Sequence, residues 1–282
     1  MIKTYYMLTK PGIILGNLIT TASGFALASK GDFHFLLFFI TLLGLGAIIA
    51  SACIFNNYID RYADEKMHRT KNRPFVKKTV SVPKALLLAT CLGIGGTFLL
   101  GMYVNLLAMM TALAGFAIYV VVYSLLKYHW TAGTLIGSVA GAMPPVVGYA
   151  AACNQLDAGA ATLFFILVLW QMPHFFSIAL YRLEDYKAAS IPVLPLTKGN
   201  LITKIHMLLY ILAFIGAESL LLLLGYTGYI YLATAAVLSF AWLALCIKGF
   251  KCTNDVKWAR QMFRFSLVVI TAISVLISCD TL

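Results

Sequence analysis

The chain has 282 residues, of which 61% are hydrophobic and only 11% are charged, and its mean hydropathy is +0.89. Soluble domains average about 45–50% apolar and about 25% charged residues, so the composition excludes an ordinary water-soluble globular protein and a disordered one. A net charge of +11 would suggest nucleic acid in a soluble protein. In a membrane protein the cations belong to cytoplasmic loops, and we expect no nucleic-acid partner.

Apolar runs of about twenty residues recur along the chain, the length at which a helix spans the core of a bilayer. These runs lack the alternation of barrel strands, and a segment in lipid must satisfy its own backbone, so they predict helices. The predicted fold class is all-α, a polytopic membrane protein with a single membrane domain over residues 1–282. Nine spans are expected, at about 12–28, 35–59, 84–103, 106–126, 133–152, 159–181, 205–225, 228–248 and 261–279.

The distribution of cations predicts the orientation of these spans. If the N-terminus is cytoplasmic, every Lys and Arg except Lys30 falls on the cytoplasmic side, as the positive-inside rule requires. The C-terminus is then periplasmic. Two long connections, about 60–83 and 182–204, lie on the cytoplasmic side, and long loops in a compact protein are usually functional.

Polar side chains gather at the inner end of the second span. At about 100° per residue, the side chains of Asn56, Asn57, Asp60 and Asp64 share one stripe of a helix. Carboxylate and amide oxygens in this arrangement suit a hard cation such as Mg²⁺; the alternative is a helix end that carries solvated acids. The following run Arg69-Thr70-Lys71-Asn72-Arg73-Pro74 adds the cations that a diphosphate needs beside the metal.

The sixth span carries a second polar stripe. His174, Tyr181 and Asp185 fall on one helical face, with His174 about 16 Å deeper than Asp185 at 1.5 Å per residue. Polar groups within a span usually face the bundle interior or a cavity. For His174, an interhelical hydrogen bond and a cofactor contact both remain open, and His129 and His206 are the next candidates for a cofactor contact. Glu218, an acid within the seventh span, leaves open a transporter that uses an intramembrane ion path.

The stripe Asn56-Asn57-x-x-Asp60-x-x-x-Asp64 resembles the first aspartate motif of the UbiA superfamily of intramembrane prenyltransferases. Two positions differ from the common pattern of that superfamily: Asn57 stands in place of the Asp of its Asn-Asp opening, and the second motif begins at Tyr181 rather than at an Asp. Further strings resemble the branch of this superfamily that farnesylates haem: Thr9-Lys10-Pro11-Gly12, Arg69-Thr70-Lys71-Asn72-Arg73-Pro74, Gly133-Thr134-x-x-Gly137-Ser138, Trp170-Gln171-Met172-Pro173-His174 and Ile191-Pro192-Val193-Leu194-Pro195.

The resemblance implies farnesyl diphosphate and haem b as substrates, haem O and diphosphate as products, and Mg²⁺ as the cofactor. It implies a location in a bacterial inner membrane and, as a further partner, a terminal oxidase or a haem-handling protein. A related enzyme that prenylates a quinone or lipid precursor is the nearest alternative. The implied site comprises Asn57, Asp60, Asp64 and Asp185 for the metal, Lys71, Arg73, Lys127, Arg182 and Lys187 for the diphosphate, and His174 for haem iron or a propionate.

Overall fold

The computed structural model describes residues 2–281, and in this range the chain is helical apart from its connections and one isolated β-bridge between Thr227 and Thr281. Nine of the described helical segments are long and apolar enough to cross a membrane. They are α2 (Pro11–Ser29), α3 (Phe35–Ile59), α5 (Val82–Tyr103), α6 with η1 and α7 (Leu106–Ala117, Ile118–Tyr123, Ser124–Leu126), α8 with α9 (Gly133–Gly141, Met143–Cys153), α10 (Ala158–Tyr181), α12 (Leu194–Leu223), α13 with η2 (Tyr229–Lys248, Gly249–Lys251) and α14 (Asp255–Cys279).

These segments confirm the nine predicted spans, with larger differences at two starts. The seventh span begins at Leu194 instead of about residue 205, although its backbone breaks at Gly199 (φ 83°, ψ 168°). The ninth begins at Asp255 instead of about residue 261. Both early turns carry polar residues, which hydropathy excludes from a span but which a helix end at the membrane surface accommodates.

Two of the spans are irregular where they face the interior of the bundle. The fourth contains the π-helical stretch η1, and the fifth is divided at Ala142, just before Pro144 and Pro145. Proline has no N–H to continue the hydrogen-bond ladder, but it is tolerated in the first turn of a helix, so α9 begins there. Irregular backbone at membrane depth is tolerated where protein buries it or where it lines a cavity.

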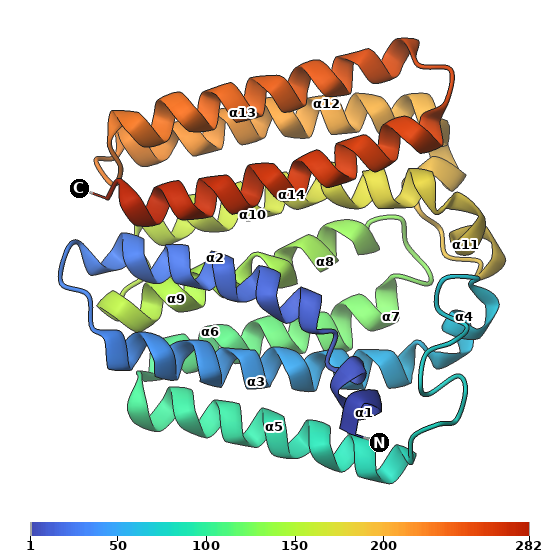
Figure 1. The fold of residues 1–282 in the computed structure, drawn as a ribbon, viewed down its shortest axis with the longest axis horizontal. Helices are drawn as coiled ribbons and strands as arrows, with labels where there is room; N and C mark the ends of the chain where they lie inside the picture. The colour runs from blue at the N-terminus through green and yellow to red at the C-terminus, as the bar shows by residue number, and fades with distance from the viewer. Residues whose placement is uncertain (1, 282) are drawn as a thin grey trace.

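The helices pack as antiparallel neighbours with their connections at two opposite ends (Figure 1). α2 packs closely on α9, α3 on α5, and α10 on both α12 and α14. The α2–α9 contact is so close that a Cβ added at Gly148 would lie 2.0 Å from the Thr21 carbonyl oxygen. Small residues allow such backbone approach in membrane helices.

The two predicted long loops meet at one end of the bundle. The first contains the short helix α4 (Arg61–Lys66) and the second contains α11 (Leu183–Ala188), and both lie at the right-hand end in Figure 1. Met67 of the first loop packs with Ala189 and Ile191 of the second in one buried apolar cluster. The sequence places these loops on one side of the membrane, and the fold brings them into contact.

Candidate active site

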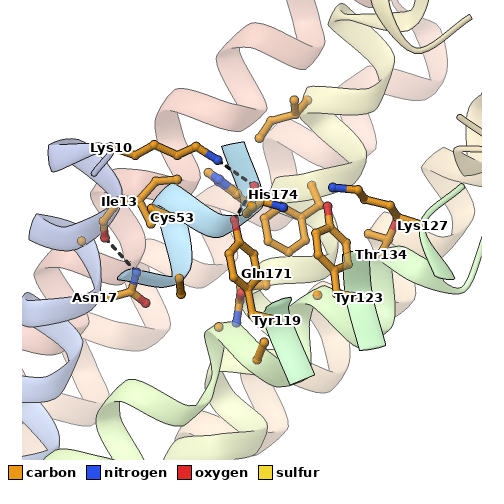
Figure 2. A pocket seen from close by; sticks show the side chains of 18 of the residues that line it. Lys10, Ile13, Asn17, Cys53, Tyr119, Tyr123, Lys127, Thr134, Gln171 and His174 are labelled. Carbon is orange, nitrogen blue, oxygen red and sulfur yellow. Dashed lines mark hydrogen bonds between the residues drawn. The ribbon is translucent and has the colours of Figure 1, made fainter. Parts of the chain in front are cut away.

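A cavity of about 760 Å³ runs from the two acidic loops into the membrane-embedded part of the bundle. Its walls come from α2, α3, α6 with η1, α8, α9, α10 and α14. Figure 2 shows polar side chains around the same space, including Tyr119 and His174 from these helices, Lys10 just before α2 and Lys127 just after α7. The cavity is polar at the loop end and mainly apolar beyond it.

Asp60 and Asp64 line the loop end of the cavity, each beside a cation. Asp60 ends α3, and its Oδ1 forms an ion pair with Lys127 and accepts a hydrogen bond from the Tyr128 hydroxyl at 2.8 Å. Asp64 lies one turn later on α4, and its Oδ2 accepts from Arg73 at 2.6 Å. The structure therefore brings together four of the predicted residues, two carboxylates and two cations.

Burial changes the proton affinity of the basic and phenolic groups at this end. It lowers the pKa of Lys127, while the neighbouring Asp60 carboxylate opposes that shift. Burial also raises the pKa of Tyr128, and Asp60 adds to the rise. Tyr128 is therefore a hydrogen-bond donor at neutral pH.

Adjacent asparagines at the end of α3 face different surroundings. Asn56 lines the cavity, and its Oδ1 accepts from Lys10 Nζ at 2.8 Å and from the Tyr119 hydroxyl at 3.1 Å. Asn57 is outside the described lining, because one residue turns a helical side chain by about 100°. Its Nδ2 donates to the Leu8 carbonyl at 2.8 Å, towards α1 (Ile2–Leu8). The structure thus places Asn56, rather than the predicted Asn57, beside Asp60 and Asp64.

Lys10 is a site residue to which the sequence assigned no role, although it stands in the string Thr9-Lys10-Pro11-Gly12 that resembles the haem branch of the family. Its left-handed backbone (φ 53°) forms the bend between α1 and α2, and this bend carries the amino group to the cavity wall. Burial, assisted by the nearby Arg73 and Lys127 cations, lowers the pKa of Lys10 to about 8. The sequence signals are this string and the position of a lysine directly before Pro11 at the start of the first span, which the positive-inside rule already explains.

The residues of the second acidic loop lie at the edge of the cavity. Asp185 is buried, with its Oδ1 3.4 Å from the Arg69 backbone nitrogen and its Oδ2 3.9 Å from the Arg182 guanidinium. Arg69 and Tyr186 line the cavity, whereas Asp185 does not appear in the described lining. Lys71 and Lys187 are exposed outside it.

The deep end of the cavity is formed by α8, α10 and α14. Gln171 Nε2 donates to the Ser138 carbonyl at 3.0 Å, and a Cβ added at Gly141 would lie 2.1 Å from Gln171 Oε1. His174, one turn further along α10, contacts Ser266 of α14 through Nδ1 at 2.7 Å. Gly141 of α8 therefore provides the space that the Gln171 side chain occupies.

Other acids and histidines from the sequence analysis lie elsewhere. Glu218 is buried between α12 and α13, where its Oε2 accepts from Ser239 at 2.9 Å, and the described cavity lining does not include it. His129 and His206 are also absent from that lining. Glu218, on which the transporter interpretation depends, therefore lies apart from this cavity in the described part of the chain.

The donor set at the loop end fits a divalent cation that is shared with a substrate. No group of three His, Cys, Asp or Glu side chains within residues 2–281 could enclose a metal ion by itself. Mg²⁺ usually takes one or two carboxylates and completes its shell with water and phosphate oxygens. In the described structure, Asp60 Oδ2 and Asp64 Oδ1 have no hydrogen-bond partner and are not sealed from solvent. Both are therefore free to bind such an ion.

Comparison with solved structures shows the same fold in three other proteins. A structure described as digeranylgeranylglyceryl phosphate synthase superposes with a TM-score of 0.79 at 17% identity and covers 99% of both chains. A UbiA homologue from Aeropyrum pernix K1 gives 0.72 at 16% identity, covering 94% of this chain and 98% of that one. A UbiA homologue from Archaeoglobus fulgidus bound to DMAPP and Mg²⁺ gives 0.71 at 16% identity, covering 98% and 99%.

Sequence comparison identifies much nearer relatives. The chain is 54% identical over 280 residues to the protoheme IX farnesyltransferase of Protochlamydia amoebophila, covering 99% of both proteins. It is 54% identical over 281 residues to the protoheme IX farnesyltransferase of Yersinia pseudotuberculosis, covering 99% of this chain and 95% of that protein. A model of the UbiA prenyltransferase family matches residues 17–268. This multi-pass membrane protein therefore belongs to the UbiA prenyltransferase family.

Proposed function

We propose that this protein transfers the farnesyl group of farnesyl diphosphate to a vinyl group of haem b, with addition of water, and releases haem O and diphosphate. The observation that carries the proposal is the 54% identity, over 99% of the chain, to proteins named protoheme IX farnesyltransferase. The cavity agrees with it, because one end offers carboxylates and cations to a diphosphate and the remainder offers an apolar wall to a prenyl chain.

The loop end is proposed as the diphosphate site. Asp60 and Asp64 would hold Mg²⁺, the cation that is bound together with DMAPP in the Archaeoglobus homologue. When bound, the ion supplies charge neutralisation to the leaving diphosphate. Lys127 and Arg73 already lie beside these carboxylates and would donate to diphosphate oxygens. Asp185 and Arg182 belong to the adjoining loop, from which they would join this site at its edge.

Some predicted site residues do not line the described part of the cavity, and their roles are proposed from the family resemblance alone. These residues are Asn57, Lys71, Arg182, Asp185 and Lys187; Asn57 is turned towards α1, and the two lysines are exposed. A contact between these lysines and diphosphate would require the loops to close over the substrate. Loop closure of this kind sequesters many enzyme reactions from water.

The aromatic wall next to the diphosphate site suits an allylic cation. When the C1–O bond of farnesyl diphosphate breaks, its electron pair leaves with the diphosphate and positive charge develops on the farnesyl group. Tyr119 and Tyr123 line the cavity as a stacked pair with centroids 5.6 Å apart, and an aromatic face stabilises a nearby cation by about 0.5–2 kcal/mol. The apolar walls also exclude bulk water.

The remaining steps complete the proposed reaction. The terminal carbon of a haem vinyl group attacks farnesyl C1, which places the positive charge on the vinyl carbon next to the macrocycle. Water adds to that carbon, and the proton lost from this water goes to the diphosphate. The product therefore carries one new C–C bond and one hydroxyl group.

Purified protein in detergent tests the acceptor. With farnesyl diphosphate, Mg²⁺ and haem b, we expect diphosphate release and a haem product whose mass has increased by one farnesyl group and one hydroxyl group. Quinone and lipid precursors are the control acceptors. Farnesylation of one of these, with haem b unchanged, would contradict the proposed acceptor while preserving the prenyltransferase activity.

The pH dependence of diphosphate binding should report on Lys10. Its pKa of about 8 means that the amino group is cationic below pH 8 and neutral above it, so affinity for inorganic diphosphate should fall as pH rises through 8. A single titrating cation limits this fall to about tenfold per pH unit. Calorimetric titration at pH 7 and pH 9 measures it. Lys10→Arg, which stays charged throughout, should flatten the profile, and an unchanged profile would remove Lys10 from the site.

We also propose that the loop end faces the cytoplasm in a bacterial inner membrane, and that a terminal oxidase or haem-handling protein is a partner. The cation distribution supports this orientation. Reporters fused after Pro74 or Gly199 should be cytoplasmic, and reporters fused after Lys30 or Asn154, at the opposite end of the bundle, should be periplasmic (Figure 1). Any one reporter on the other side would refute the assignment.

A further inference from the structure

His174 is held by one turn of α14 at the deep end of the cavity. Its Nδ1 lies 2.7 Å from Ser266 Oγ, and Ser266 Oγ lies 2.7 Å from the Phe263 carbonyl oxygen. Trp170, one turn before His174 on α10, donates its indole N–H to the Ser266 carbonyl at 2.8 Å. Two residues of α10 are thus anchored to the same turn, so the position of His174 is determined by α14.

The two short contacts of Ser266 determine which imidazole nitrogen carries the proton. A carbonyl oxygen only accepts, so the Ser266 hydroxyl proton must lie between Ser266 Oγ and the Phe263 carbonyl. A hydroxyl has one proton, so the proton between Ser266 and His174 must come from the imidazole. The Nδ1 atom of His174 therefore carries a proton. Burial of a charged imidazolium without an acidic partner is costly, and His174 is buried, so the ring is neutral and Nε2 keeps a lone pair.

The lone pair of Nε2 is presented to the cavity. His174 lines that cavity (Figure 2), and within the described structure Nε2 has no hydrogen-bond partner and is not among the sealed polar atoms. The imidazole ring is held between Trp170, with centroids 4.8 Å apart and an interplanar angle of 27°, and Phe263, at 4.8 Å and 35°. The ring therefore has little freedom to turn Nε2 away.

A fixed, unpartnered imidazole nitrogen in an apolar cavity is the arrangement of a metal ligand whose other nitrogen is hydrogen-bonded. Such a hydrogen bond sets the tautomer and the ring orientation and raises the basicity of the ligating nitrogen. A proximal histidine of this kind holds haem iron in several protein classes. His174 lies seven residues before the end of α10 at Tyr181, a depth of roughly 10 Å at 1.5 Å per residue, in the part of the cavity beyond the diphosphate site.

We infer that Ser266 is a positioning residue that holds His174 as the Nδ1–H tautomer, so that Nε2 ligates the iron of the haem acceptor. This inference rests on the proposed function, which supplies haem b as the acceptor. Ser266 does not itself touch the substrate. Ser266 acts through His174, and this positioning role explains why a buried serine of α14 contacts an imidazole of α10.

Absorption spectroscopy of the purified protein during titration with haem b tests this inference. We expect a wild-type Soret band typical of histidine ligation, which His174→Gly should lose and which free imidazole should restore in that variant. Ser266→Ala should shift the band and weaken haem binding by about tenfold or more, the usual effect of removing such a hydrogen bond. Ser266→Thr, which keeps the hydroxyl, should restore both properties.

A matched control is Ser274→Ala, because Ser274 is also buried on α14 but lies about two turns away. It should bind haem as the wild type does, and calorimetric binding of farnesyl diphosphate should be unchanged in every variant.

If wild-type protein binds haem but His174→Gly keeps its band and affinity, the ligand assignment is wrong. If His174→Gly loses the Soret band but Ser266→Ala keeps the wild-type band and haem affinity, the positioning role of Ser266 is wrong. Failure of the wild type to bind haem, with farnesyl diphosphate still bound, would overturn the proposed acceptor as well.

Discussion

Asp60→Asn and Asp64→Asn are each expected to lower farnesyl transfer by about 10²–10³-fold, the usual scale for losing one electrostatic contact to the leaving group. Both carboxylates line the cavity, and each has one oxygen without a partner in the described structure. An amide keeps the shape of the side chain but has no negative charge with which to hold a divalent cation. Haem O formation in purified protein measures the effect.

The choice of asparagine follows from the buried partners of these acids. The sequence predicts that alanine at either position leaves the fold intact, because an acid at the membrane edge should have no buried partner charge. The structure contradicts that reasoning for Asp60, since Lys127 is buried beside it with an exposed fraction of 8%. Removal of one member of a buried pair is strongly destabilising. Thermal melting should therefore accompany each activity measurement.

Glu65→Gln is the matched control for this experiment. Glu65 follows Asp64 on α4 but is exposed and absent from the described cavity lining. It should keep wild-type activity. The metal assignment would fail if either asparagine variant, folded and at normal levels, kept more than about a tenth of wild-type activity, because the expected loss is larger.

Gly148→Ala is expected to cause a large loss of stability for so small a substitution. The added Cβ would lie 2.0 Å from the Thr21 carbonyl oxygen and 2.9 Å from the Phe25 amide nitrogen. These are backbone atoms of α2, so the two helices must separate. Overpacking of this kind costs about 1–3 kcal/mol and sometimes more, and the α2–α9 contact supports one wall of the cavity.

Thermal unfolding in detergent compares this variant with Gly216→Ala. Gly216 lies on α12 and has no atom within 4 Å of an added Cβ, and alanine favours a helix by about 1 kcal/mol over glycine. We expect the midpoint of Gly148→Ala to fall and that of Gly216→Ala to stay level or rise. Equal midpoints for the two variants would show that α2 and α9 are less closely packed than described.

Local composition determined most of the architecture of this protein. A bilayer core requires about twenty apolar residues for each helix, so the number of spans and most of their limits follow from runs of residues that hydropathy alone identifies. The periodicity of a helix likewise places Asp60 and Asp64 on one face, because their separation of four residues is a property of one segment. The early starts of α12 and α14 escaped this reasoning because the added residues include polar and charged side chains, such as Lys198 and Asn200 in α12 and Asp255 in α14.

Only the tertiary structure decided which polar groups share the cavity. Asn56 lines it and Asn57 does not, because the rotation of α3 is set by its contacts with neighbouring helices. The bend at Lys10 and the pairing of Asp60 with Lys127 join segments that are distant along the chain. The contact between His174 and Ser266 spans 92 residues. Local periodicity carries no information about such pairs, since they arise from the packing of one helix against another.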